Sequence, residues 1–267
     1  MATREARVVP DARGRLWVSL PDGRVAAWYD RDTGRVTLLV PGRRDAVLTA
    51  LRPLLSPGWT IGPPPVPGRA DLARLALPPD EDLAPNRPGE DLHGVLDHGR
   101  GPAGPLGRRA LRRELRAREL VGAALDALEP AGWRVLHELP LPAGEHVHHL
   151  AIGPAGVLCV RTVPAGGHRV RCDADLVRIG RAVPRPDPRL ARRAADLAAR
   201  ALAAAVTPVL ALAGAGADRI DRRPDARDLL VLADTELDGA LTGAGPTLKP
   251  AEIAGLYARA RDRRTWR

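Results

Sequence analysis

Three histidines stand close together in the string Glu145-His146-Val147-His148-His149. Side chains alternate along a strand, so His146 and His148 would share one face, as in an H-x-H metal site. Such a site needs a third ligand, and no spacing in the sequence brings one to it. The candidates for that third ligand are His137, His168 and Cys159. A turn followed by a strand edge explains these histidines more simply, so His146 and His148 are weak metal candidates and we expect no resident cofactor.

A second pattern is a stripe of arginines. Arg108, Arg112 and Arg116 follow one another at i, i+4 and i+8 of a predicted helix, a spacing that could track a nucleic-acid backbone. The alternative is an ordinary solvated helix face, on which Glu114 and Arg118 form an i, i+4 ion pair. We expect nucleic acid, if it binds, to contact this stripe.

The charge of the whole chain allows two interpretations. The net charge is +9 and the sequence pI is about 11.0, which is typical of proteins that attract phosphate. However, Lys249 is the only lysine, so 41 − 1 = 40 of the basic residues are arginines. A genome of high GC content produces the same arginine excess whatever the function, so charge alone assigns no partner.

Other reaction chemistries find little support. The only serines, Ser19 and Ser56, have no Gly-x-Ser-x-Gly context, so serine hydrolysis is not expected. The run Gly153-Pro154-Ala155-Gly156 lacks the Lys-Ser or Lys-Thr of a phosphate loop and predicts a turn. Cys159 and Cys172 lie in apolar, strand-like segments, which predicts buried thiols.

The elements that would position these residues begin with a small N-terminal unit, residues 1–60. Strand-like runs at Arg15–Leu20, Arg24–Tyr29 and Arg35–Val40 predict a three-stranded meander joined by tight turns. Apolar residues then recur at helical spacing from Val47 to Leu55 before Ser-Pro-Gly ends the helix. That helix can cover one side of the meander.

Residues 61–107 change character and predict a linker rich in proline and glycine. One short amphipathic piece, Ala70–Leu77, could form a helical turn or two within it.

Residues 108–267 predict a single α+β or α/β domain with a mixed sheet and flanking helices. A helix runs from Arg108 through Leu128, another from Asp187 to about Ala205, and a last one begins at Pro250. The predicted strands of this sheet are Trp133–Leu139, Val147–Ile152, Val157–Val163, His168–Cys172, Leu176–Ile179, Val206–Ala213 and Leu229–Ala233.

The strands around the histidines resemble the NERD (nuclease-related domain) family of actinobacterial type. The matching segments are GWRVLHELPLP at residues 132–142 and HVHHLAIGPAGVLCVRTVPAGGHRV at residues 146–170. The N-terminal unit and the proline-rich stretch also resemble sequence that precedes this domain, so the likeness covers most of the chain. It implies a restriction-endonuclease-like fold, in which carboxylates on adjacent strands hold Mg²⁺ and a lysine positions the attacking water.

The residues that would cut DNA are replaced at the matching positions. The family's metal-binding aspartate corresponds to His148, its second acidic residue to Arg161 and its lysine to Val163, while Glu119 is the best match for its helical glutamate. An arginine would repel a dication placed beside it. The sole lysine, Lys249, lies far along the chain. This pattern indicates a pseudoenzyme that keeps the apolar residues of the strand and lacks the polar catalytic residues.

We therefore expect a catalytically inactive nuclease-related protein that binds DNA or an unidentified protein partner. One alternative is an active metal-dependent DNA nuclease with displaced ligands such as Glu119, His148 and His149, the one case that would need Mg²⁺ or another divalent ion. A second alternative is a purely structural or interaction protein. No run reaches the roughly 18 apolar residues of a membrane span and the first residues are charged, so we expect a cytoplasmic protein with no membrane partner, and the sequence indicates no small-molecule substrate.

Overall fold

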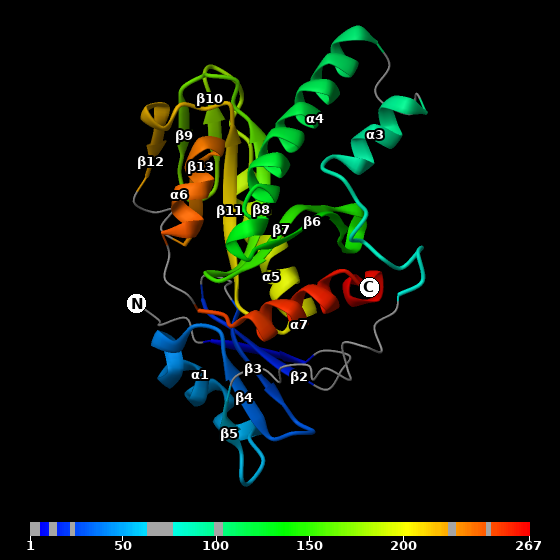
Figure 1. The fold of residues 1–267 in the computed structure, drawn as a ribbon. Helices are drawn as coiled ribbons and strands as arrows, with labels where there is room; N and C mark the ends of the chain where they lie inside the picture. Colours follow the sequence, from blue (N-terminus) through cyan, green and yellow to red (C-terminus); the bar gives the residue numbers. More distant parts are fainter. Residues whose placement is uncertain are drawn as a thin grey trace. The chain divides into compact units, whose positions relative to one another are not determined.

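The chain divides into two compact units (Figure 1). The first comprises Met1–Val66 with Ala203–Ala205, and the second comprises Pro67–Leu202 with Val206–Arg267. The computed structural model describes residues 6–10, 15–21, 25–62, 77–98, 104–223, 228–243 and 247–267.

The first unit is a five-stranded sheet with one helix against it. The strands, in spatial order, are β1 (Arg7–Pro10), β2 (Arg15–Ser19), β3 (Val25–Asp30), β4 (Arg35–Leu38) and β5 (Thr60–Ile61). Strands β1 to β4 pair antiparallel, and β5 adds in parallel. Helix α1 (Arg44–Leu51) packs Val47 and Leu51 into the core under the sheet. The predicted meander and helix are confirmed, and the short edge strands β1 and β5 are additions that the sequence did not indicate.

The second unit is built on a mixed five-stranded sheet. In spatial order its strands are β13 (Leu230–Ala233), β11 (Val206–Ala213), β8 (Gly156–Pro164), β7 (His146–Gly153) and β6 (Arg134–Pro140). Strands β6, β7 and β8 form an antiparallel meander, whereas β8, β11 and β13 run parallel. Parallel neighbours need crossover connections, and the one between β8 and β11 holds helix α5.

Helices cover both faces of this sheet, as Figure 1 shows. Helix α4 (Pro105–Asp126) places Ala117, Val121 and Leu125 on the face that carries Leu158 and Val160 of β8. Helix α5 (Asp187–Leu202) packs on the opposite face, where Ala191 joins the alternate residues of β8 and β11, Val163, Leu210 and Leu212. Both faces of β8 are therefore buried, as expected for a strand with a nearly continuous apolar run.

Two further helices and a small second sheet complete the unit. Helix α6 (Leu237–Thr242) adds Leu237 and Leu241 to the α4 side, and α7 (Pro250–Ala260) contacts β6 and β7. Strands β10 (Val177–Ile179), β9 (Val170–Cys172) and β12 (Ile220–Arg222) form a separate three-stranded sheet. The sequence placed the first two of these strands in the main sheet, because strand patterns alone do not specify partners. Within the described ranges, no helix is long and apolar enough to cross a membrane.

The stretch predicted as a linker, residues 61–107, is partly an ordered piece of the second unit. Helix α3 (Glu90–Asp97) lies beside α4, and Leu83 is completely buried. The side-chain amide of Asn86 donates to the carbonyl oxygens of His137 and Glu138 in the middle of β6. Proline and glycine therefore shape a docked segment here, not only a spacer. The predicted short helix at residues 70–77 lies outside the described residues except for its last position.

Candidate functional site

A buried ion cluster lies where α3, α4 and β6 meet. Arg118 of α4 and Glu138 of β6 are 8% and 4% exposed. Nη1 of Arg118 lies 2.9 Å from both carboxylate oxygens of Glu138 and 2.8 Å from Oδ1 of Asp91 in α3. The backbone N–H of Gly89 donates to Oε1 of Glu138 at 3.1 Å. One guanidinium nitrogen thus meets three carboxylate oxygens from two chain segments far apart in sequence.

The backbone turns Glu138 toward this cluster. Residues on either side of it keep regular strand pairing, His137 with His149 and Leu139 with Val147. Glu138 itself has a φ of 47°, a left-handed conformation that a residue with a Cβ rarely adopts. Consecutive strand residues ordinarily point to opposite faces, yet both His137 and Glu138 bond to α4. The unusual φ therefore brings the carboxylate to Arg118.

Burial also changes the acidity of this carboxyl group. Desolvation, reinforced by the nearby charge of Asp91, raises the pKa of Glu138 to about 7, although Arg118 and the Gly89 amide favour the ionised form. Removing a buried carboxylate from water costs free energy that a single ion pair only partly returns. The pair is consequently sensitive to the loss of either partner.

His148, which the resemblance matched to a metal-binding position, is bonded to the backbone through one of its ring nitrogens. Its Nδ1 accepts a hydrogen bond from the backbone N–H of Thr162 at 3.1 Å. Burial, followed by the charges of Arg118 and Arg161, holds the pKa of His148 well below its ordinary value. The ring is therefore neutral with its proton on Nε2. Regular pairing of β7 with β8 ends at His149 and Val160, and beyond it the side chain of His148 accepts the backbone N–H of Thr162.

His149 belongs to a buried chain of polar side chains on the α4 face. Its Nε2 lies 3.0 Å from Oγ1 of Thr162 and its Nδ1 lies 2.9 Å from Nδ1 of His137, whose Nε2 is 3.2 Å from a carboxylate oxygen of Asp126. The carboxylate only accepts, so His137 donates to it, His149 donates to His137, and the threonine hydroxyl donates to His149. Burial and the neighbouring His137 hold the pKa of His149 well below its ordinary value. Both ring nitrogens of His137 and of His149 have a partner, as expected for a structural hydrogen-bond network.

The two other positions that the resemblance singled out, Arg161 and Val163, lie on β8. Arg161 donates from Nε to Oδ1 of Asp187 at 2.8 Å, and Asp187, at the start of α5, is 1% exposed. Val163 is completely buried in the apolar cluster under α5. Arg161 therefore supplies a fixed positive charge, and Val163 supplies packing.

Glu119 lies away from this cluster. Its side chain is 48% exposed and sits 3.5 Å from Nε2 of His93 in α3. The inward residue of this helical turn is Arg118, so the predicted surface pair of Arg118 with Glu114 is wrong. A signal was present in the sequence, because Arg118, Val121 and Leu125 recur at helical spacing on one face.

A possible metal site exists close by, but an arginine shares it. Ligand atoms of Asp91, Glu138 and His146 lie within 4.8 Å of one another, the one such group among the residues that the structure describes. Nη1 of Arg118 is within 2.9 Å of both carboxylates, so a cation there would face a guanidinium at contact distance. The predicted pairing of His146 with His148 is not part of this group.

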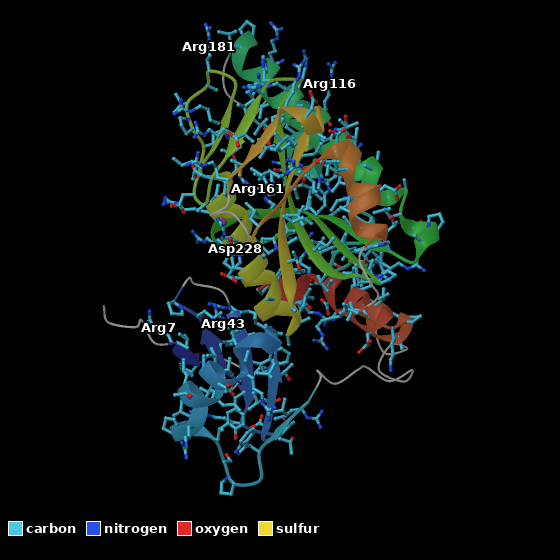
Figure 2. The ribbon with its side chains drawn as sticks, turned by 90° about the vertical axis from the view of Figure 1, so that its left-hand side faces the viewer. Arg7, Arg43, Arg116, Arg161, Arg181 and Asp228 are labelled. Carbon is cyan, nitrogen blue, oxygen red and sulfur yellow. The ribbon has the colours of Figure 1, made fainter. Side chains whose placement is uncertain are left out.

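The arginine stripe lies on the solvent side of α4. Arg108, Arg112 and Arg116 are exposed, as are Arg109 and Arg113. None of these five forms a salt bridge within the described part of the chain. Figure 2 places Arg116 at the same end of the second unit as Arg181, where many side-chain nitrogens gather. This end of the unit is a strongly basic surface.

Comparisons with models of protein families, with curated proteins and with solved structures find no match for this chain.

Proposed function

We propose that this protein is a catalytically silent, nuclease-related module that binds nucleic acid. The observation that carries the proposal is that the buried carboxylates near the matched positions are paired with guanidinium groups and are not free to bind a metal ion. Arg118 is held between carboxylates, and Arg161 is held by Asp187. Both charges act on His148, which lies buried in the same region. A dication at that place would meet two resident positive charges and a neutral ring whose Nδ1 is already bonded.

The order of elements supports the nuclease-related part of the proposal. A helix, α4, precedes three antiparallel strands, β6 to β8, after which α5 leads to the parallel strand β11. A mixed sheet with helices on both faces is what the resemblance to the NERD family implies through its restriction-endonuclease-like fold. The positions that match the family's catalytic residues fall on the adjacent strands β7 and β8.

The exposed face of α4 supports the nucleic-acid part. The buried Arg118 and the half-buried Arg161 have carboxylate partners, whereas Arg108, Arg112 and Arg116 have no ion-pair partner in the described residues. Unpaired surface arginines at helical spacing can exchange condensed counterions for contacts with phosphates, which favours binding at low salt. We therefore assign the stripe as the nucleic-acid contact.

Fluorescence anisotropy with a labelled 20-base-pair duplex, titrated at several salt concentrations, tests the binding. Replacing Arg108, Arg112 and Arg116 by alanine removes up to three phosphate contacts, so the slope of log K against log salt should become less steep by about 2.7, or 3 × 0.9. A triple variant with alanine at Arg43, Arg44 and Arg52, which are exposed on the first unit, changes the charge equally and is the matched control. Absence of binding by the wild type at low salt, or equal losses in both variants, would contradict the proposal.

A cleavage assay tests the silent site separately. Supercoiled plasmid incubated with the protein and Mg²⁺, Mn²⁺ or Zn²⁺ should remain uncut. If nicking is seen, the variant Glu138→Gln distinguishes its source, because a contaminating nuclease would be unaffected by it. Metal-dependent nicking that the variant abolishes would establish an active nuclease and overturn the silent-site proposal.

A further inference from the structure

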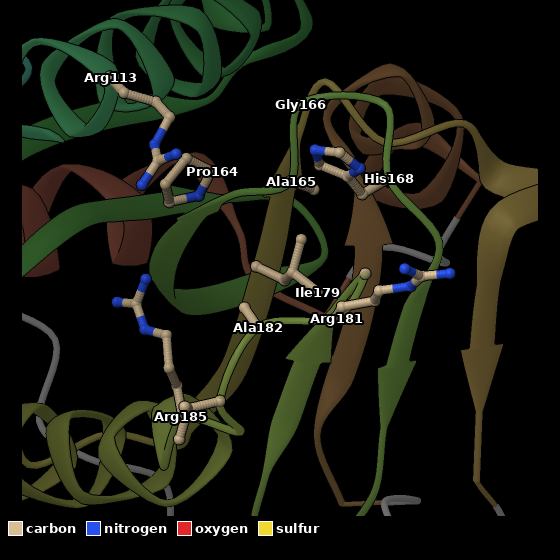
Figure 3. Close-up of a pocket in the computed structure, with 11 residues that line it drawn as sticks. Arg113, Pro164, Ala165, Gly166, His168, Ile179, Arg181, Ala182 and Arg185 are labelled. Atoms are coloured by element: carbon tan, nitrogen blue, oxygen red, sulfur yellow. The ribbon is translucent and has the colours of Figure 1, made fainter. Parts of the chain in front are cut away.

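A groove of about 450 Å³ opens on the second unit beside the N-terminal half of α4. Its walls come from α4, from the turn after β8 and from the segment between β10 and α5 (Figure 3). The groove is large enough for one nucleotide-sized ligand. Its ionisable lining residues are Arg113, His168, Arg181 and Arg185, and no acidic residue lines it.

Two arginines face each other across this groove. In Figure 3 the guanidinium groups of Arg113 and Arg185 point toward one another from α4 and from the segment that precedes α5. Arg185 is anchored by Asp187, with Nε 2.9 Å from Oδ2. Asp187 also pairs with Arg161, so this single carboxylate balances only one of the two positive charges of Arg161 and Arg185. Two guanidinium groups that point toward one another from opposite walls of a groove can bind a phosphate between them.

The rest of the lining is suited to the organic part of a nucleotide. Ile179, Ala182 and Val183 provide an apolar surface, and Val183 is 83% exposed. His168 and Arg181 lie on the far side of this surface from Arg113 in Figure 3, and both are exposed. Imidazole and guanidinium planes can stack on a base, and apolar side chains can contact a base or sugar.

We propose that this groove binds a phosphorylated nucleotide, with the phosphate between Arg113 and Arg185 and the base or sugar against Ile179, Ala182 and Val183. The ligand is either the 5′ end of a single strand or a free nucleotide, which share this chemistry. The inference deepens the proposed function, and it rests on that function where the ligand is the 5′ end of a single strand. Arg113 is the residue of α4 that lines the groove, and it stands next to Arg112 of the stripe in sequence.

The test compares ligands that differ in one phosphate. Anisotropy is measured with a 3′-labelled single-stranded DNA 12-mer carrying a 5′-phosphate and with its 5′-hydroxyl twin, and dAMP and deoxyadenosine serve as competitors. Two arginine contacts to a doubly charged phosphate should favour the phosphorylated 12-mer by about tenfold or more. The double variant Arg113→Ala/Arg185→Ala, which removes both proposed phosphate contacts, should lose this preference. The control Arg43→Ala/Arg44→Ala, with the same change in charge on exposed residues of the first unit, should keep it.

The outcomes separate this inference from the proposed function. Binding of both 12-mers without a phosphate preference, or an equal loss of preference in both double variants, would overturn the groove while leaving nucleic-acid binding intact. Binding of dAMP but not of deoxyadenosine in a direct calorimetric titration, with no binding of either oligonucleotide, would support the groove with a free nucleotide as its ligand and would overturn the proposed function. Tighter binding of an Asp- and Glu-rich peptide than of any phosphorylated ligand would overturn the nucleotide assignment.

Discussion

The change Arg118→Met should be among the most destabilising single substitutions in the second unit. It removes a guanidinium that is 8% exposed and leaves Glu138, at 4% exposed, with only the Gly89 amide. Leaving one partner of a buried ion pair uncompensated costs about 3–5 kcal/mol. Methionine fills much of the same volume, so the loss reports mainly on charge and hydrogen bonding, not on a cavity.

A double-mutant cycle gives the coupling within the pair. Glu138→Gln should also destabilise the unit, because it leaves Arg118 with Asp91 alone. In the double variant Arg118→Met/Glu138→Gln no buried charge lacks its partner, so its loss should be smaller than the sum of the two single losses by about 2 kcal/mol or more. Single losses that simply add would refute the account of the site as a coupled ion pair.

The measurement must report on the second unit alone. Three of the five tryptophans, Trp17, Trp28 and Trp59, lie in the first unit, so fluorescence would mix two transitions. Hydrogen exchange of peptides from β6, β7 and β8 gives the free energy of opening of the affected sheet. Glu119→Gln on the neighbouring exposed position is the matched control, and it should change that free energy by no more than about 0.5 kcal/mol.

Two further predictions concern other buried groups. Because the pKa values of His148 and His149 are lowered by burial, the unfolded chain binds two more protons below the ordinary histidine pKa, and stability should fall with falling pH. Glu138, with its pKa raised to about 7, opposes this trend, because the folded chain holds one proton on it that the unfolded chain releases. The free energy of unfolding of the second unit, measured in urea, should therefore fall by about 1.4 kcal/mol for each pH unit of acidification between about pH 6 and 5, and by about twice that in Glu138→Gln. Equal slopes in the two proteins would contradict the assignment. Cys159, whose pKa burial raises to about 12, and the buried Cys172 should resist a thiol reagent in the native protein and react in denaturant; rapid labelling of the native protein would show that the strands open readily.

Local patterns in the sequence were enough for many of the elements. Alternating or continuous apolar runs located β7, β8 and β11, and helical spacing located α4, α5 and α7, because these patterns arise from the burial of each element's own face. The two cysteines were predicted as buried thiols, and they are buried. The stretch after residue 61 was less predictable, since Leu83 and Asn86 gain their partners from β6 and from the C-terminal region.

The candidate site also divides into features that the sequence predicts and features that depend on distant partners. The sequence by itself determined the residue types at His148, Arg161 and Val163, because residue type is independent of folding, and the resemblance is what predicts acids and a lysine at these positions. Only the tertiary structure decided that Arg118, not Glu119, turns inward to Glu138. That choice depends on a left-handed backbone at Glu138 and on a carboxylate from α3. Segments distant in sequence supply these partners, and the cost of burying a charge makes their positions decisive.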